Sequence, residues 1–427
     1  MTDPVPSAGG TGAGQQTSEQ KQESQHQTTR KSIAEEKKKT IVIGLSGPSS
    51  SGKTTLARLL KTIFSVSGRV RTFIIHEDDF YFPDDKIPVT RTKSGDLVQD
   101  WDTVGAIDVP FLSSALAYVR KHGTLPPRLK SKEDQNQTSD PGVDQFQVEK
   151  LQKEVGERLR RKQEGKEETE TAAAAEETGV EAETASLTVA FLEGFLLYAP
   201  PESEAPQHIL RPIHNNIHLH LFLPAPYDLV KIRREARSGY VTIGPAPTPS
   251  KKLEDNDEHK QKEQQQKEQQ QQPHQQLEET TVDLENADHH IPEQSFWTDP
   301  PGYVDDIVWP RYVQDHAWLL LPEEEQQQQS GTKPLLLAAQ ERSKNSNTLL
   351  EEELLKLAGQ GTNIRTDAGV MVAPGKGRLH ITELLDWAVK EVLNFLEAEG
   401  ETYLNIPVFL LAIFNILWTT SWKSQQD

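Results

Sequence analysis

The sequence contains no cysteine, which excludes disulfides, thiolate nucleophiles, iron–sulfur clusters and cysteine-ligated zinc sites. It is also poor in apolar residues, because only 34% of its 427 residues are hydrophobic, whereas globular chains approach half. A single core of roughly 200 to 250 residues, diluted by polar insertions, fits this composition better than three packed domains.

Positive charge is scarce as well, since 46 Lys and Arg face 65 Asp and Glu, giving a formal net charge of −19. This balance argues against nucleic acid or an anionic membrane as the main partner. The acidity is local. Residues 164–183 hold eight Glu against one Lys, and residues 251–290 hold eleven acidic residues against five Lys. The remainder of the chain is therefore only mildly acidic.

Long apolar runs are nearly missing. The first thirty residues contain no apolar stretch typical of a secretory signal. Ile406–Trp418 is apolar but is interrupted by Pro407 and Asn415. As a helix this run would span about 20 Å, short of the ~30 Å hydrocarbon core of a bilayer. We therefore expect a soluble protein of the cytoplasm or nucleus that does not bind membranes.

Short apolar runs alternate with amphipathic stretches along the middle of the chain. This alternation is typical of βαβ units and predicts an α/β fold with a parallel sheet. Strands are predicted at 40–46, 72–75, 187–192 and 217–223, and helices at 55–64, 109–121, 148–159, 225–238, 349–357 and 381–396.

Polar stretches divide the chain around this domain. We predict a disordered tail at 1–38, one domain over 39–400, and a tail of unknown role at 401–427. Low-complexity insertions are expected at about 130–186, 245–293 and 323–361. Ten of the sixteen residues at 261–276 are Gln, which makes this insertion a candidate binding segment for other proteins.

The strongest motif is Gly47–Thr54, GPSSSGKT, which matches G-x-x-x-x-G-K-[ST] in full. It lies between a predicted strand and a predicted helix, where consecutive backbone N–H groups can surround a phosphate. We expect Lys53 to reach the β- and γ-phosphates and the Thr54 hydroxyl to hold Mg²⁺. The predicted nucleotide-binding residues of this run are Gly47, Ser49, Ser50, Ser51, Gly52, Lys53, Thr54 and Thr55.

Several enzyme classes bind nucleotides in this way. No N-K-x-D guanine motif is present, which disfavours a GTPase, and transport or helicase ATPases are usually larger or built from repeats. A small-molecule kinase needs an acceptor pocket and a lid that excludes water. Candidate residues for both occur in the sequence.

Two carboxylates follow predicted strands. Asp78 lies just beyond the strand at 72–75, at the edge of the sheet where ligands of α/β proteins bind. It could orient or deprotonate an attacking hydroxyl and contact the metal, or belong to an exposed acidic turn. Glu193 ends the strand at 187–192, where it could support the water shell of the metal or be an ordinary strand-end acid.

Further candidate pocket residues are an aromatic–acidic pair and the arginines at the end of a predicted helix. Trp101 could stack on a ring and Asp102 could accept hydrogen bonds from a ribose diol, although both also suit an exposed turn. Arg234 and Arg237 could clamp phosphoryl oxygens, or form a solvated basic helix end.

Together these segments resemble the nicotinamide riboside kinases, a branch of the uridine-kinase-like P-loop kinases. The long insertions depart from the family pattern, and the one at 245–293 falls within the lid. The resemblance covers roughly 200 residues in family order, in the segments GLSGPSSSGKTTLARLL, IIHEDDFYFPDDKIPV, QDWDTVGAIDV, FLEGFLLY, LPAPYDLVKIRREARSGYVT and FWTDPPGYVDDIVWPRYV.

The resemblance implies a five-stranded parallel sheet flanked by helices, with a mobile lid. It implies transfer of the ATP γ-phosphate, with Mg²⁺, to the 5′-hydroxyl of nicotinamide riboside, and to nicotinic acid riboside as a further candidate, in NAD salvage. It also implies residue roles: Asp78, Lys53 and Arg234 in catalysis; Tyr81, Trp101, Asp102, Asp78 and Arg234 at the riboside; Arg237 and Tyr240 near the nucleotide; Thr54, Asp78 and Glu193 at the metal.

The charge of the substrate offers a separate check. Nicotinamide riboside is a cation without phosphate, so carboxylates and aromatic faces suit its pocket. Uridine would also accept stacking and a diol acceptor, so a uridine/cytidine kinase is the nearest alternative. A noncatalytic P-loop scaffold whose Gln-rich insertions recruit partners is a second alternative, disfavoured because Lys53, Thr54 and Asp78 are all present.

Overall fold

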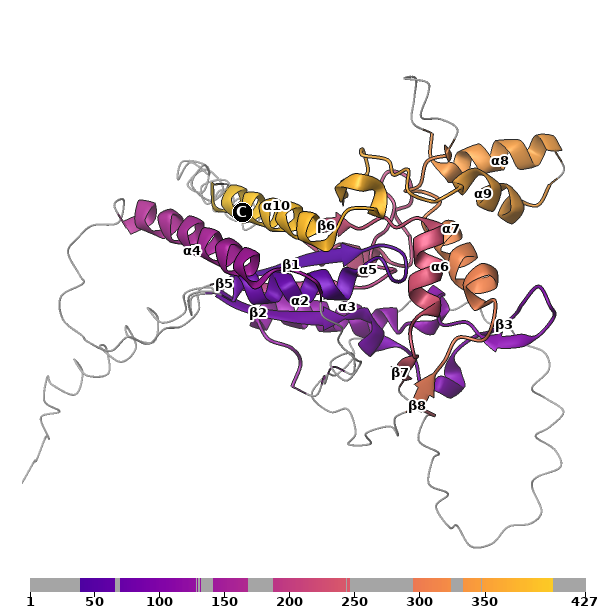
Figure 1. Ribbon diagram of the computed structural model, residues 1–427, viewed down its shortest axis with the longest axis horizontal. Helices are drawn as coiled ribbons and strands as arrows, with labels where there is room; N and C mark the ends of the chain where they lie inside the picture. Colours follow the sequence, from indigo (N-terminus) through magenta and orange to yellow (C-terminus); the bar gives the residue numbers. More distant parts are fainter. Residues whose placement is uncertain are drawn as a thin grey trace, which may run out of the picture.

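The computed structural model of the chain describes residues 39–65, 70–127, 129, 131, 141–167, 187–242, 244–245, 295–323, 333–346 and 348–401 (Figure 1). The predicted N-terminal tail, most of the first two predicted insertions and the apolar run at 406–418 lie outside the described residues. Within the described ranges, no helix is long and apolar enough to cross a membrane.

The centre of the fold is a five-stranded sheet in the order β2-β5-β1-β6-β9, and all four strand pairs are parallel. This confirms the predicted α/β class. The five strands that the family resemblance implies are also confirmed, although the position of β9 was not predicted, because two residues are too few to show a periodic pattern. The strands are β1 (Lys39–Ser46), β2 (Val70–His76), β5 (Leu187–Glu193), β6 (Leu219–Phe222) and β9 (Met371–Val372).

The inner strands β1 and β5 are covered on both faces, which explains why they read as continuous apolar runs. Their register pairs Leu45 with Glu193, and β2 pairs His76 with the same Glu193. The carboxyl ends of three neighbouring strands therefore meet at one edge of the sheet. The loops that follow these strands carry the candidate site.

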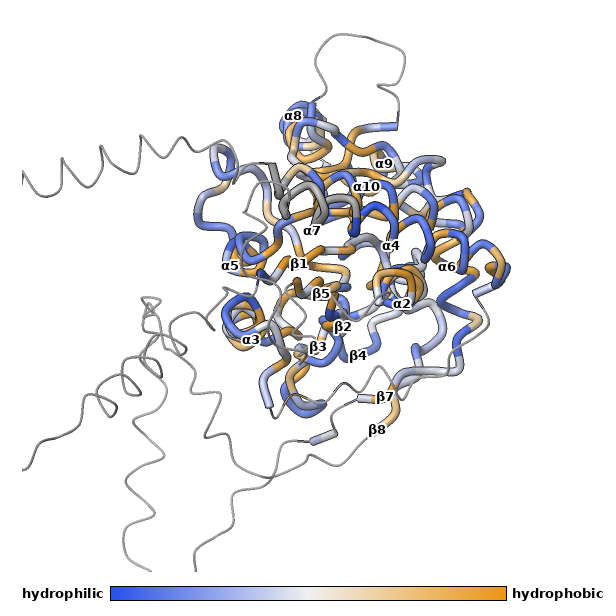
Figure 2. Tube along the Cα trace, turned by 90° about the vertical axis from the view of Figure 1, so that its left-hand side faces the viewer, coloured by the Kyte–Doolittle hydropathy of each residue, from blue (hydrophilic) through white to orange (hydrophobic). Residues whose placement is uncertain are grey.

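Helices cover both faces of the sheet (Figures 1 and 2). One apolar cluster joins β1, β5 and β6 to α2 (Lys53–Phe64), α4 (Gln145–Glu167) and α10 (Ile381–Glu401). The other cluster joins the opposite face to α3 (Val109–His122), α5 (Arg211–His214) and α7 (Trp309–Asp315). Helix α6 (Tyr227–Glu235) adds Val230 to this second cluster.

Two of the predicted insertions contain packed helices. The helix expected from Val148 to Leu159 is confirmed as α4, which an Arg158–Glu397 ion pair joins to α10. The helix expected at 349–357 is confirmed as α9 (Leu350–Ala358). Helix α8 (Leu335–Ser346), in the same predicted insertion, was not predicted, although its Leu335 and Ala339 are buried. In the sequence, Leu335–Ala339 is a continuous apolar run, which does not show a helical period.

Two short antiparallel hairpins and several single turns complete the fold. Strands β3 (Val89–Arg91) and β4 (Leu97–Gln99) form one hairpin. Strands β7 (Tyr240–Thr242) and β8 (Ser295–Trp297) form the other, which we call the lid hairpin. The turns are the 3₁₀ segments η1 (Glu77–Phe80), η2 (Asp84–Lys86), η3 (Val104–Ala106) and η7 (Pro374–Gly377), and the π-helical turn η5 (Val304–Val308).

Candidate active site

The loop between β1 and α2 has the backbone shape that a phosphate cradle requires. Gly47 has a φ of 150°, and a Cβ there would lie 2.2 Å from the carbonyl oxygen of Leu223. Ser50 and Gly52 also adopt positive φ values. The hydroxyls of Ser50 and Ser51 are buried without a hydrogen-bond partner among the described residues. These donors fit the phosphate groups of a nucleotide at the start of α2.

Lys53 begins α2 and lies buried beneath this loop, where its Nζ donates to the carbonyl oxygen of Pro48 at 2.9 Å. Burial lowers the pKa of Lys53, whereas the charges of Glu193 and Asp78 oppose this shift. Arg237 lowers the pKa further, because its positive charge faces the same region. Two cations that repel each other at one end of a pocket favour an anion between them.

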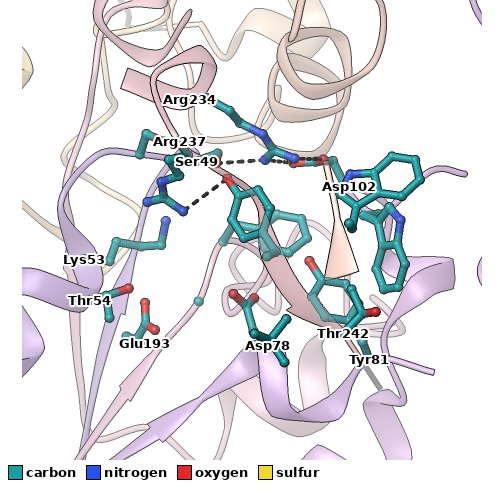
Figure 3. A pocket seen from close by; sticks show the side chains of 17 residues that line it. Ser49, Lys53, Thr54, Asp78, Tyr81, Asp102, Glu193, Arg234, Arg237 and Thr242 are labelled. Carbon is teal, nitrogen blue, oxygen red and sulfur yellow. Dashed lines mark hydrogen bonds and ion pairs between the residues drawn. The ribbon is translucent and has the colours of Figure 1, made fainter. Parts of the chain in front are cut away.

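Two of the predicted metal-binding residues, Thr54 and Glu193, lie together beside Lys53, and the third, Asp78, lies farther toward Tyr81 (Figure 3). Glu193 is buried and hydrogen-bonds to Nδ1 of His76 at 2.7 Å. Burial raises the pKa of Glu193, but hydrogen bonds to His76 and Thr54 and the charge of Lys53 lower it below its usual value overall. Asp78 reaches the same pocket from η1.

No group of three or more His, Cys, Asp or Glu in the described part of the chain is arranged to hold a metal. A hydroxyl and one or two carboxylates still suit Mg²⁺, which usually keeps several waters and takes other ligands from substrate phosphates. Thr54, Glu193 and Asp78 supply this kind of donor set. The residues present therefore fit the ion.

The opposite end of the pocket is aromatic. Tyr81 and Trp101 meet edge to face with ring centroids 5.3 Å apart, and Trp297 of β8 lies 5.9 Å from Trp101. All three rings line the pocket. Nε1 of Trp101 is buried without a hydrogen-bond partner among the described residues. These faces could hold a planar, cationic ring.

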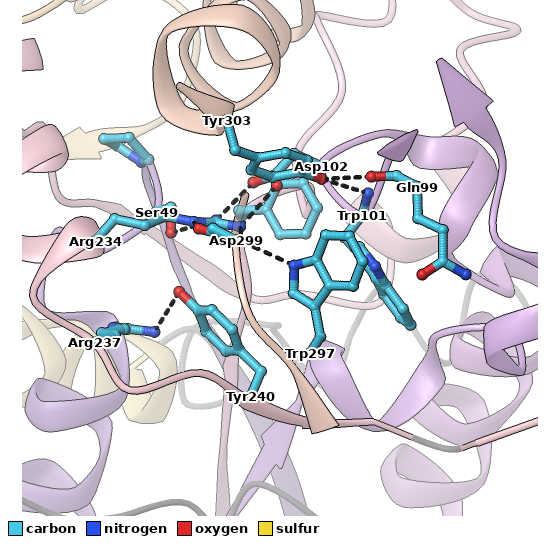
Figure 4. A network of polar contacts seen from close by, with 12 residues as sticks. Ser49, Gln99, Trp101, Asp102, Arg234, Arg237, Tyr240, Trp297, Asp299 and Tyr303 are labelled. Atoms are coloured by element: carbon cyan, nitrogen blue, oxygen red, sulfur yellow. Dashed lines mark hydrogen bonds and ion pairs between the residues drawn. The ribbon is translucent and has the colours of Figure 1, made fainter. Parts of the chain in front are cut away.

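Arg234 lies between two carboxylates above this aromatic end (Figure 4). Its guanidinium donates to both oxygens of Asp102, at 2.9 and 3.0 Å, and to both oxygens of Asp299, at 2.7 and 3.2 Å. A further bond reaches the hydroxyl of Ser49 at 2.8 Å. Burial opposes the charge of Arg234, but the two carboxylates hold its pKa well above the usual value. Arg234 therefore connects the nucleotide loop, through Ser49, to the acceptor side at Asp102 and to the segment after the lid hairpin at Asp299.

Arg237 lies at the other end, near Lys53 (Figure 3), and the ring of Tyr240 lies between Arg237 and Arg234. Nη1 of Arg237 donates to the Tyr240 hydroxyl at 3.1 Å, and its guanidinium lies 5.2 Å from the centre of that ring. Arg233 points to the nucleotide loop, where it donates to the carbonyl oxygen of Ser50 at 3.4 Å. The pocket is thus basic at the nucleotide loop and acidic and aromatic at the far end.

Three curated fungal proteins are similar to this chain, while no family model matches it. The nicotinamide riboside kinase of Schizosaccharomyces pombe is 27% identical over 284 residues, which cover 66% of this chain and 82% of that protein. Those of Saccharomyces cerevisiae and Eremothecium gossypii are each 24% identical, over 66% and 65% of this chain and 80% and 76% of the respective proteins. These similarities support the resemblance of the chain to the nicotinamide riboside kinase family. The chain is accordingly a kinase, a phosphotransferase with an alcohol acceptor.

Most of the residues predicted for this kinase line one pocket, although their individual roles stay predictions. Gly47, Ser51, Gly52 and Thr55 are not lining residues and belong to the turn and the start of α2 that form the phosphate cradle. The predicted residues that line the pocket are Ser49, Ser50, Lys53, Thr54, Asp78, Tyr81, Trp101, Asp102, Glu193, Arg234, Arg237 and Tyr240.

The sequence analysis missed several residues of the kinase pocket. Trp297 and Thr242 line it, and Asp299 shares Arg234 with Asp102. Trp297 and Asp299 lie in the aromatic segment that carries part of the family resemblance, which could have drawn attention to them. Thr242 ends another segment of that resemblance, LPAPYDLVKIRREARSGYVT, which could have drawn attention to it in the same way.

Glu77 was also missed, because it looks like one more acid in the run at 77–79. It is fully buried, and its Oε2 accepts backbone hydrogen bonds from Phe195 at 2.6 Å and Leu196 at 3.1 Å. Burial raises the pKa of Glu77 to about 7. Its carboxylate holds the loop after β5 and so helps to place Glu193 beside Asp78.

Proposed function

We propose that this kinase transfers the γ-phosphate of ATP, with Mg²⁺, to the 5′-hydroxyl of nicotinamide riboside and supplies nicotinamide mononucleotide for NAD salvage. The observation that carries the proposal is the division of one pocket into two ends. Lys53 and Arg237 surround the end that suits a triphosphate. Asp102 and the rings of Trp101 and Trp297 form the end that suits a cationic nucleoside.

In this proposal Asp78 is the base, supported by its position between the two ends (Figure 3). Asp78 accepts the proton of the 5′-hydroxyl as the oxygen bonds to the γ-phosphorus, and the bond to the β,γ-bridging oxygen breaks to release ADP. Lys53 and the backbone N–H groups of the loop bind phosphate oxygens. When bound, Mg²⁺ neutralises charge on the phosphoryl oxygens.

The two arginines have different surroundings. Arg234 was predicted to clamp the transferring phosphoryl group, but its guanidinium is already shared by Asp102 and Asp299. We propose that it holds Asp102 in place for the ribose diol. Arg237, which faces Lys53, is then the better candidate for contact with phosphate oxygens.

The acidic end also separates possible acceptors. Nicotinic acid riboside carries a carboxylate in place of the ring carboxamide, and the carboxylates of Asp102 and Asp299 would repel it. We expect it to be phosphorylated more slowly than nicotinamide riboside. Uridine, being neutral, would lose the attraction to this end of the pocket but keep the stacking.

Acceptor-dependent ADP release by the purified full-length chain tests the proposal. Nicotinamide riboside, nicotinic acid riboside, uridine and no acceptor are compared, and the product is identified by mass. We expect kcat/KM for nicotinamide riboside to exceed that for uridine at least tenfold. In Asp78→Asn, the rate of ADP release with nicotinamide riboside should fall to the rate without acceptor. A preference for uridine, or release of ADP that no acceptor stimulates, would contradict the proposal.

A further inference from the structure

The segment that carries the acceptor-side residues, 99–102, is held from outside the pocket. The hydroxyl of Tyr303 accepts a hydrogen bond from the backbone N–H of Trp101 at 3.0 Å. The same hydroxyl donates to the carbonyl oxygen of Gln99 at 3.0 Å (Figure 4). One side chain therefore bridges the backbone on both sides of Asp100.

Two further contacts reach this segment from the same part of the chain. Arg311 contacts one oxygen of Asp100 through Nε at 2.8 Å and Nη2 at 2.6 Å. Asp299 holds Arg234, which in turn binds Asp102. All three contacts originate in residues 299–311, which directly follow the lid hairpin.

Tyr303 itself does not line the pocket and is only 1% exposed. Its ring lies 5.9 Å from that of Trp297 and 5.6 Å from the guanidinium carbon of Arg234. Burial raises the pKa of Tyr303, so its hydroxyl stays protonated and can donate and accept at once. Tyr303 can therefore act on a substrate only through the residues that it contacts, among them Trp101 and Arg234.

We propose that Tyr303 is a positioning residue for the acceptor nucleoside. The Tyr303 hydroxyl fixes the backbone at Trp101 and so orients the Trp101 ring and the Asp102 carboxylate toward the substrate. The choice of nicotinamide riboside as that acceptor rests on the proposed function. The role of Tyr303 rests on its contacts alone.

Loss of the hydroxyl would leave a buried N–H and a buried carbonyl oxygen without their partner. The segment at 99–102 would then move to regain hydrogen bonds, and displacements of about 1 Å are enough to weaken binding and reaction. The nucleotide loop has no contact with this hydroxyl. The defect should therefore concern the acceptor and spare ATP.

Tyr303→Phe tests the proposal, and Tyr312→Phe is a matched control. Tyr312 is also buried, and its hydroxyl donates to the backbone carbonyl of Gly361 at 3.0 Å rather than to segment 99–102. We expect Tyr303→Phe to raise KM for the riboside five- to thirtyfold, with kcat and KM for ATP changed less than about twofold. Tyr312→Phe should lower thermal stability to a similar extent but leave the riboside KM within twofold.

Hydrogen exchange provides a readout that needs no substrate. Amide exchange in the peptide covering 97–104 should be faster in Tyr303→Phe than in the wild type, and unchanged in Tyr312→Phe. If Tyr303→Phe does not fold, Arg311→Gln removes a second contact to the same segment and should raise the riboside KM in the same selective way.

Equal effects of the two Tyr→Phe changes on the riboside KM, or unchanged exchange at 97–104, would overturn the proposal. A wild-type preference for uridine would instead refute the proposed function. The KM comparison would then be made with uridine, and the exchange result would stand unchanged.

Discussion

Carboxylates outnumber cations at the acceptor end of the pocket. Arg234 carries one positive charge, whereas Asp102 and Asp299 carry two negative charges between them. The group keeps a net negative charge beside Trp101 and Trp297, where it can attract a cationic ring without contacting it directly. A single substitution in this group therefore changes which nucleosides bind well.

Asp78 and Asp102 should differ in the kinetic constant that each controls. Asp78→Asn keeps the shape and removes the base, so kcat should fall by about 10²- to 10⁴-fold with little change in KM. Asp102→Asn weakens a charged hydrogen bond to the ribose in ground and transition states alike, and should raise the riboside KM by one to two decades. Steady-state kinetics with ATP and riboside varied in turn measures both, and KM for ATP serves as the internal control. The reverse pattern would mean that base and diol acceptor are exchanged.

Asp315 should make the stability of the fold depend on pH. Its Oδ2 is buried without a partner among the described residues, and burial raises the pKa of Asp315 to about 7. The folded state keeps a proton that the unfolded state releases above pH ~4, so stability falls as pH rises from about 4 to about 7. Asp315→Asn should remove this loss. Relative to the wild type, its free energy of unfolding should be about 2 kcal/mol more favourable at pH 8 than at pH 5. Urea denaturation at the two pH values measures the difference, and an equal gain at both would contradict the assignment.

At the scale of elements, each strand of the lid hairpin is held by a carboxylate of the surrounding fold. Strands β7 and β8 are three residues each and are joined by residues 243–294. Closing a loop of roughly 50 residues costs about 2 kcal/mol more than closing one of four. The Asp84 carboxylate accepts bonds from the Thr242 hydroxyl at 2.8 Å and the Gly244 N–H at 3.1 Å, and so fixes the β7 side. Asp299 fixes the β8 side through Arg234.

Loss of the Asp84 carboxylate should loosen the lid. Asp84→Ala removes both side-chain bonds to β7, so water should enter the pocket more easily. We expect KM for both substrates to rise about three- to tenfold and ADP release without acceptor to increase relative to the wild type. Asp96→Ala, which removes an exposed carboxylate of the β3–β4 turn, is the control. If Asp84→Ala released ADP without acceptor at the wild-type rate, the contact of Asp84 with the lid hairpin would not be what closes the pocket.

The insertion between the lid strands should matter little for the reaction. Residues 251–290 are too polar to bury the apolar surface that would offset ordering entropy. Their deletion should therefore keep kcat/KM for the riboside within about threefold, or roughly 0.7 kcal/mol in the barrier. A loss of a hundredfold or more would show that these residues act at the pocket.

The elements that the sequence predicts well are those with enough residues to show a period. Strands β1 and β5 are eight and seven residues long and mostly apolar, and the helix of the phosphate motif follows directly from its pattern. The hairpins and β9 have two or three residues per strand and carry no such signal. The pairing of Trp101 with Tyr303 spans 202 positions, so only the folded chain brings these two residues together.

At the scale of the whole molecule, the four long sheet strands and the nucleotide loop all precede residue 243, whereas β9, α7 and α10 follow residue 294 (Figure 1). The later part is not peripheral. Helix α10 packs on α2 and α4 through a shared apolar cluster, and β9 pairs with β6. Neither part has a complete pocket without the other.

The separate attachment of β7 and β8 to the body has a consequence for chain continuity. Because neither strand depends on the connection to hold its place, the peptide bond between them is dispensable for assembly. Co-expressed fragments 1–270 and 271–427 should therefore associate into a single active kinase, and a permuted chain with new termini in this region should also fold. Co-purification of the fragments with riboside-dependent ADP release measures this, and soluble fragments that fail to associate would contradict it. Gene fission or the insertion of an entire foreign domain at this point would then leave the catalytic unit intact.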